Sequence, residues 1–431
     1  MKKIILYTAL LFPFLANAQQ LLTLKNAIDT ALKNSFDIQI AKNNAEINKI
    51  NNTLGVAGGL PSVSATAGDN SSVSYIDQKY YSGSETNKNN VTANNLSAGI
   101  TANMVLFNGF KIIATKERLS CLQKQSELQL NQQVQNTIAA LMVKYYDIIR
   151  QQNYLKIIQN SLDVSDKKLD IINEKNNVGM ANSVDILQAQ MDVNSAEQNF
   201  KLQQLIIDQD KADLLLLMNA KQYNPYIIND SIIVDKNIQL DSIINYLDHN
   251  PQYLSAEQQI KINEQIVKEI SSQRYPSIKI NTAYNFSHNQ SDAGLTLFNQ
   301  NYGPSAGVTL QIPIFNGNAY KIQHETATYE VNNSKLQKES LFRTLTTNAI
   351  KTYQSYTTTL QQLSSQQVNY ELSKKLVDVV MHNFQVNQAT ILDVKAAQTS
   401  FENAGYLLVN LQYAAKAAEI ELKQLIFRLG Y

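Results

Sequence analysis

The chain has 431 residues, of which 37 are basic and 36 are acidic. This length allows two or three domains, and the near-balanced charge gives no reason to expect nucleic acid or acidic substrates as partners. The only cysteine, Cys121, excludes an intrachain disulfide and is expected to pack within a helix interface.

The first residues have the pattern of a secretory signal peptide. Two lysines precede an apolar run from Ile4 to Leu15, and the small residues around Ala18 form a cleavage site. We expect residues 1–18 to be removed on export. No later segment reaches the roughly 18 continuous apolar residues of a transmembrane helix. The mature chain therefore either does not cross a membrane or crosses it with β-strands.

The mature chain contains the same unit twice. VLFNGF at 105–110 returns as PIFNGN at 313–318, and SVDILQAQMDVNSA returns as ILDVKAAQTSFENA at the same spacing. We therefore expect a first repeat over residues 19–218 and a second over residues 242–431. The segment 219–241 between them breaks the helical pattern, and we expect a linker with one or two short strands.

Each repeat opens with an amphipathic helix, at about 21–56 and 239–273, which ends at a Pro-Ser pair. Runs of alternation follow. In LSAGITANMVLF every even-numbered residue from Leu96 to Leu106 is apolar, the signature of a strand with one apolar face. The alternation predicts strands at about 61–75, 96–107, 277–288 and 305–315. The polar segments inside each strand pair, 75–95 and 288–303, are expected to be loops.

A Phe-Asn-Gly trio follows the second strand of each repeat. Asn and Gly tolerate the positive φ that other residues resist, so we expect an abrupt change from strand to helix at this point. The predicted turn residues are Phe107, Asn108 and Gly109 in the first repeat and Phe315, Asn316 and Gly317 in the second.

Very long helices follow these turns. From Lys111 to Asn177 there is neither Pro nor Gly. Apolar residues recur there at every seventh position, which is typical of coiled-coil packing; these are Val134, Leu141, Ile148, Leu155, Leu162 and Leu169. A helix of this length would extend for roughly 100 Å. Tight tips near Gly179 and Asn387 suit the left-handed conformation that ends a helix. We expect return helices at about 182–218 and 390–428.

The four predicted strands are too few to close a transmembrane barrel, since known barrels begin at about eight. An open sheet edge in lipid would leave backbone groups unpaired, at a cost of several kcal/mol each. Other copies must therefore complete the sheet: two chains would give eight strands and three would give twelve. The inward face carries Ser, Thr, Asn and Gly, which suit an open pore and favour three copies.

The heptads taken alone favour a coiled-coil bundle without a pore. A periplasmic coiled-coil scaffold or adaptor of that kind is the alternative function, whereas the alternating strands favour the channel.

We find no catalytic constellation. The four histidines lie on unrelated elements without metal-ligand spacing, and no phosphate-binding or dinucleotide-binding motif is present. We therefore expect no enzyme activity, no metal and no cofactor.

The duplicated LFNG and IFNG turns, the paired LPS and YPS helix ends and the VGMANSVDILQAQ tip, in this order, resemble the TolC-like outer-membrane efflux family. The resemblance covers essentially the whole mature chain. It implies an internally duplicated α+β membrane protein, a homotrimer in which four strands per chain form a twelve-stranded barrel in outer-membrane lipid. Long antiparallel helical hairpins would continue it as a periplasmic α-barrel tunnel, with 219–241 in an equatorial belt.

The resemblance also implies a function. The trimer would be the exit duct of a tripartite efflux or type I secretion system. It would passively conduct small molecules or proteins to the outside from a periplasmic adaptor and an inner-membrane transporter of the RND, ABC or MFS type.

Two groups of residues take roles from the resemblance. The hairpin tips would contact the adaptor, through Val178, Gly179 and Met180 and through Val386, Asn387 and Gln388. Asp185 and Asp393, early in the return helices, would face the lumen as a cation-selecting gate. From the residues alone, both aspartates equally suit a helix N-terminus, where the helix dipole favours a carboxylate.

Overall fold

The computed structural model describes residues 20–220, 226–293 and 296–430. The predicted signal peptide at 1–18 lies outside the described residues. The chain divides into two compact units. One, the helical unit, is formed by the described residues within 20–40, 132–250 and 344–430, and the other, the sheet unit, by those within 41–131 and 251–343.

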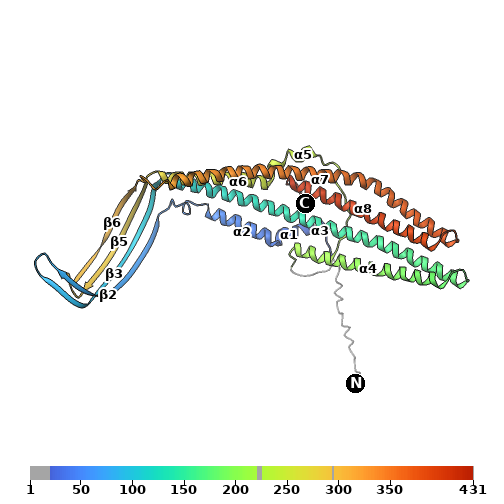
Figure 1. Ribbon diagram of the computed structural model, residues 1–431, viewed down its shortest axis with the longest axis horizontal. Coiled ribbons are helices and arrows are strands. Elements are labelled where there is room, and N and C mark those ends of the chain that lie inside the picture. The colour runs from blue at the N-terminus through green and yellow to red at the C-terminus, as the bar shows by residue number, and fades with distance from the viewer. Residues whose placement is uncertain (1–19, 221–225, 294–295, 431) are drawn as a thin grey trace, which may run out of the picture. The chain divides into compact units, whose positions relative to one another are not determined.

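The elements occur in nearly the same order twice (Figure 1). The helices are α1 (Leu24–Asn34), α2 (Phe36–Asn51), α3 (Lys111–Asn177), α4 (Ser183–Leu217), α5 (Leu240–Ile244), α6 (Pro251–Ser271), α7 (Ala319–Gln385) and α8 (Ile391–Leu425). The strands are β1 (Gln20–Leu21), β2 (Ser62–Lys79), β3 (Glu85–Asn108), β4 (Tyr226–Ile227), β5 (Ser277–Ser291) and β6 (Phe298–Gln311). Helices α3 and α7 both have 67 residues, and α4 and α8 both have 35. The predicted duplicated α+β fold with long helical hairpins is confirmed.

The first helix of each repeat is shorter than its sequence indicates. The helix predicted at 21–56 is divided into α1 and α2 by Ser35, whose Oγ accepts from the Ile38 amide and caps the second helix. The helix predicted at 239–273 is divided before Pro251, which begins α6 because proline fits the first turn of a helix and not its interior.

The sheet unit contains a four-stranded antiparallel sheet in the order β2-β3-β5-β6. Its strands extend into segments predicted to be loops. Within residues 75–95, β2 and β3 remain paired up to Lys79 and Glu85, except at a bulge where Tyr75 lies opposite Asn89 and Asn90. In the second pair, β5 continues to Ser291 and β6 starts at Phe298. The extensions are rich in Asn, Ser and Thr on both faces, so they lack the apolar alternation by which a strand is recognised.

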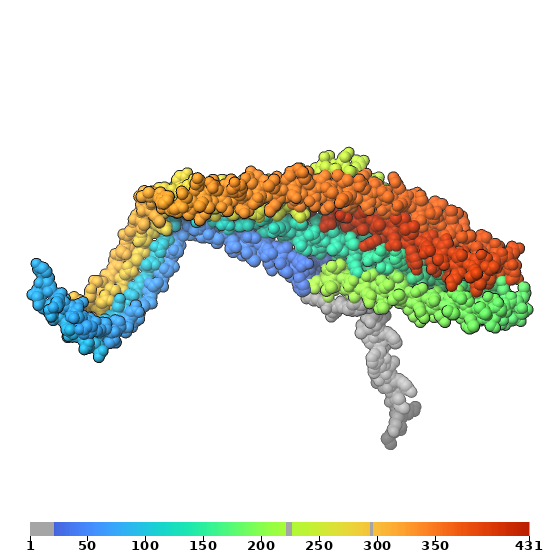
Figure 2. Space-filling model, in the orientation of Figure 1, coloured from blue at the N-terminus to red at the C-terminus, as the bar shows by residue number. Residues whose placement is uncertain are grey.

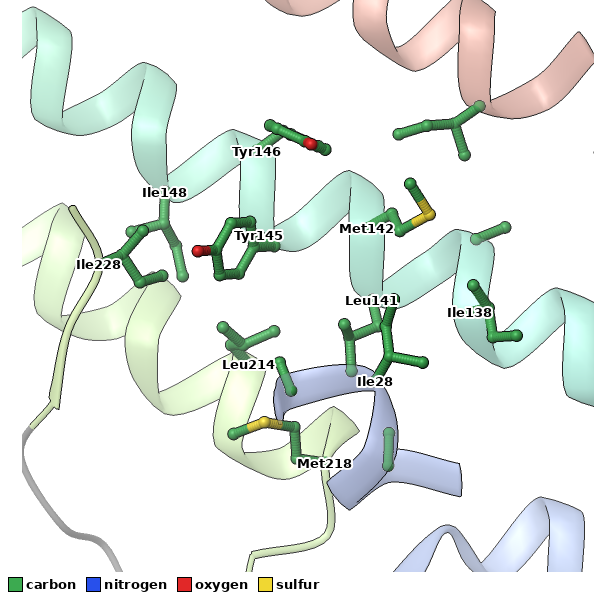
Figure 3. Close-up of a cluster of buried hydrophobic side chains, with 14 of the residues drawn as sticks. Ile28, Ile138, Leu141, Met142, Tyr145, Tyr146, Ile148, Leu214, Met218 and Ile228 are labelled. Atoms are coloured by element: carbon green, nitrogen blue, oxygen red, sulfur yellow. The ribbon is translucent and has the colours of Figure 1, made fainter. Parts of the chain in front are cut away.

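The helical unit has its largest core where α1, α3, α4 and the end of α8 meet. Ile28, Leu141, Tyr145 and Leu214 are almost completely buried there (Figure 3). Within the predicted linker, β4 pairs in parallel with β1. The Asp235 amide in the same segment donates to Glu419 of α8 at 2.9 Å. The linker is therefore held to the helices by backbone pairing and by a buried carboxylate.

Candidate functional site

The strand-to-helix turn of the first repeat contains two consecutive residues with positive φ. Asn108 is the last residue of β3, Gly109 has φ +67° and Phe110 has φ +70°, and α3 begins at Lys111. A Cβ on Gly109 would overlap the Ser272 carbonyl oxygen and lie 2.8 Å from the Tyr275 Cβ. Only glycine allows this close approach.

The second turn has the same backbone but more space. Gly317 has φ +66° and Asn318 has φ +65°, directly before α7, and no atom lies within 4 Å of a Cβ built on Gly317. The predicted Phe315 and Asn316 lie between the end of β6 and this pair. Phe110 and Asn318 are turn residues that were not predicted from the sequence. Asn at positive φ is common, whereas a phenylalanine gives no such signal.

Both hairpin tips end their long helix in the same way, with a Schellman motif. After α3, the Gly179 amide donates to Asn176 O at 2.9 Å and the Met180 amide to Lys175 O at 2.7 Å. After α7, the corresponding bonds join Asn387 to Phe384 and Gln388 to Asn383. Gly179 and Asn387 both have positive φ, at +74° and +61°. The equivalence of the two tips is therefore visible in the backbone.

The tips, which lie at the green and red ends of the two helical hairpins in Figure 2, have exposed apolar side chains. Val178 is 70% exposed, Met180 63% and Val386 49%. Behind them the two hairpins are joined by Lys175, whose ammonium donates to Phe384 O at 2.5 Å and lies 4.1 Å from the centroid of that ring. Burial lowers the pKa of Lys175. The predicted contact residues are therefore exposed, and the two hairpins that carry them are held together by the contact between Lys175 and Phe384.

The two predicted gate residues each lie in the first turn of a return helix. Asp393 and Thr390 form a capping box: the Asp393 carboxylate accepts from the Thr390 amide at 2.8 Å, and Thr390 Oγ1 accepts from the Asp393 amide at 3.2 Å. The Thr390 hydroxyl also donates to the Asp393 carboxylate at 2.7 Å. The bond from the Thr390 amide, and then the bond from its hydroxyl, lower the pKa of Asp393. The equivalent cap of α4 is Asn182, which accepts from the Asp185 amide at 2.9 Å.

A buried polar network that the sequence analysis missed joins α3, α4 and α8. The Lys168 side chain is completely buried, with its Nζ 2.5 Å from Asp192 Oδ2, and Lys395 reaches Asp192 Oδ1 at 3.0 Å. Burial raises the pKa of Asp192, but hydrogen bonds from Lys168 and Lys395 outweigh it, and the pKa is below its ordinary value. Gln398 Nε2 donates to Ser165 Oγ at 2.9 Å.

The two faces of the sheet differ sharply. One face is apolar and exposed: Ile100 is 58% exposed, Tyr302 71% and Val308 70%. A shallow apolar groove runs over its alanines between Ile100 and Phe286. The opposite face carries Ser, Thr, Asn and Gly, as in the row Ser64, Thr101, Ala283 and Ser305. Among the described strands, β2 and β6 pair on one side only.

Two features are absent from the described residues. None of their helices has both the length and the apolar character required to cross a membrane. No group of three or more His, Cys, Asp and Glu side chains within them is arranged to hold a metal ion.

The chain is similar to several known proteins. The family model described as outer membrane efflux protein matches residues 27–220 and again 243–426. Outer membrane protein TolC of Vibrio cholerae is 20% identical over 351 residues, which cover 78% of this chain and 77% of that protein. TolC of Escherichia coli is 19% identical over 364 residues, 81% and 73% of the two chains. The crystal structure of the outer membrane protein VceC from Vibrio cholerae superposes with a TM-score of 0.74 at 17% identity, covering 94% of this chain and 95% of that one.

Proposed function

The chain belongs to the outer membrane efflux protein family, and from this premise we propose that three copies form a passive exit duct in the outer membrane. The duct performs no chemistry. A periplasmic adaptor connects it to an inner-membrane transporter that supplies the energy, and small molecules or proteins pass through it to the outside.

The sheet with two open edges is the observation that carries this proposal. Its apolar face is exposed in the single chain, which suits contact with acyl chains, and its polar face suits a water-filled lumen. The free edges of β2 and β6 would each leave a row of unpaired backbone groups in lipid. Pairing β2 of one copy with β6 of the next removes both edges, and three copies close a ring of twelve strands.

Each second strand is followed within a few residues by a long helix, which supports a duct that continues on the periplasmic side. Both second strands are followed by a pair of residues with positive φ, Gly109–Phe110 and Gly317–Asn318, before the helix begins. Six such turns would surround the lumen of a trimer at the junction between sheet and helices.

The exposed apolar tips are the proposed adaptor contact. Val178 and Met180 on one tip and Val386 on the other would lose their exposure in such a complex. Asp185 and Asp393 lie just behind these tips, where a three-fold arrangement would bring six carboxylates near the axis. A cation-selecting gate at this level remains part of the proposal.

Conductance in a planar lipid bilayer tests the duct against the alternative of a pore-free periplasmic scaffold. The purified protein is expected to insert and give discrete conductance steps. Absence of any conductance from a folded, detergent-soluble oligomer would overturn the proposal and favour the scaffold.

Co-purification with an adaptor tests the tips. Gly179→Trp places a large ring at the first tip and is expected to abolish the complex, whereas Gly83→Trp is the matched control. Gly83 also has positive φ, at +84°, and open space around it, but it lies in the turn between β2 and β3. Equal adaptor recovery with both variants would contradict the assignment of the tips.

A further inference from the structure

The polar face of the sheet is almost free of charge. Cross-strand pairing aligns its residues in rows, and the rows contain Ser, Thr, Asn, Gly and Ala. Lys279 is on this face because it lies two residues before Asn281 on β5, and side chains two residues apart on a strand share a face. It pairs with Val105 of β3 and Thr309 of β6. The row of Lys279 lies just beyond the first residue of β2, because Ser62 pairs with Asn103 in the neighbouring row. On that face, among β5 from Ser277 to Ser291 and the described residues aligned with it on β2, β3 and β6, Lys279 is the one ionisable residue.

The neighbours of Lys279 lie close to the backbone of the sheet. Asn281 covers Gly307, where a Cβ would be 3.2 Å from the Asn281 Nδ2, and Asn285 covers Gly99, where a Cβ would be 2.6 Å from the Asn285 Oδ1. Both amides therefore fill the space that a larger cross-strand residue would take. Lys279, exposed on its strand, has the longest side chain in this part of the face.

We propose that Lys279 is a specificity-determining residue that favours anionic solutes as they pass the sheet. The inference rests on the proposed trimeric duct, in which three copies of Lys279 would lie at one level as a ring of positive charge. Walls of low dielectric constant focus the field of such a ring into the lumen, and rings of Lys or Arg are known to select anions in pores. No carboxylate on the same described rows opposes it.

The ratio of chloride to potassium permeability, measured from the reversal potential in a KCl gradient across a planar bilayer, tests this inference. Lys279→Met removes the charge and retains the length of the side chain. Three charges near the path of an ion give an effect of about two- to threefold at low salt. We therefore expect Lys279→Met to lower the ratio by about this factor and Lys279→Glu to lower it further.

Three controls distinguish charge from structure. Lys279→Arg retains the charge and should retain the wild-type ratio. Lys25→Met removes one exposed positive charge from α1, outside the sheet, and should leave the ratio unchanged. The effect of Lys279→Met should also shrink as salt is raised, because ions screen the ring.

The outcomes separate this inference from the proposed function. Conducting Lys279→Met and Lys279→Glu channels with the wild-type permeability ratio would overturn the role of Lys279 and leave the duct intact. A wild-type protein that forms no channel would overturn both.

Discussion

At the scale of single residues, the two strand-to-helix turns share a backbone conformation but differ in how closely they are packed. Gly109 faces the Ser272 carbonyl and the Tyr275 side chain, whereas Gly317 faces open space. The Phe-Asn-Gly trios predict the turns themselves, since Asn and Gly tolerate positive φ. The difference in packing depends on α6 and the residues after it, which are distant in sequence, so a local motif does not reveal it.

This difference gives the first prediction, for Gly109→Ala and its matched control Gly317→Ala. Both variants place alanine at positive φ and should lose about 1–2 kcal/mol of stability. Gly109→Ala should lose about 1–3 kcal/mol more, because the added methyl overlaps its neighbours. Urea unfolding followed by circular dichroism measures both values. Equal losses of stability in the two variants would show that the close packing around Gly109 does not add to the cost of its substitution.

The capping box of α8 gives the second prediction. Thr390→Ala removes the side chain that accepts from the Asp393 amide and should cost about 1 kcal/mol. The lowered pKa of Asp393 means that its contribution to stability is present above the ordinary carboxyl pKa. That contribution is lost as the pH falls through the lowered pKa. The thermal unfolding midpoint of the wild type should therefore fall more at acid pH than that of Asp393→Asn. The same dependence of the midpoint on pH in both proteins would contradict this.

The same pair of residues separates the two roles that the sequence allows for Asp393. Thr390→Ala weakens the cap and retains the carboxylate, whereas Asp393→Asn removes the charge. If Asp393 also contributes to a cation gate, only Asp393→Asn changes ion selectivity in a bilayer. A selectivity unchanged by Asp393→Asn would leave the aspartate with its capping role alone.

At the scale of helices, the buried stripe of α3 changes its chemistry along its length. Leu141 and Ile148 of the predicted heptad are completely buried in the largest core. Nearer the tip, Leu155, Leu162 and Leu169 are only partly buried. The buried positions there include the polar residues Ser161, Ser165 and Lys168, between the buried Ile158 and Ile172. Hydropathy does not identify these as interior residues, because their partners are on α4 and α8.

The network around Lys168 gives the third prediction. Asp192→Asn leaves the buried Lys168 ammonium without its counter-charge and should destabilise the protein by about 3–5 kcal/mol. Lys395, whose side chain is 52% exposed, is the second partner of the Asp192 carboxylate. Lys395→Met removes this partner and should lower the free energy of unfolding by only about 0–1 kcal/mol. Chemical unfolding compares the two. A larger loss for Lys395→Met would show that the buried pair does not hold these helices together.

At the scale of the whole molecule, the duplication is the feature that the sequence predicts best. The repeated turns and tips lie at one spacing, and the structure repeats a 67-residue and a 35-residue helix in the corresponding places. The full extent of the strands was missed, because Asn, Ser and Thr in the 75–95 segment pair across the sheet without alternating in polarity. Backbone pairing there depends on a neighbouring strand, not on an apolar face.

The central claim is that the free edges of β2 and β6 pair between copies and close a ring of three. Disulfide formation between these edges tests it most directly, in a Cys121→Ala background. Ser64→Cys on β2 is combined in turn with Ser305→Cys, Thr309→Cys or Gln311→Cys on β6, all on the polar face. We predict that at least one pair, oxidised in outer membranes, gives covalent dimers and trimers and no larger species. Monomers alone, or a ladder extending beyond three chains, would contradict the closed trimer.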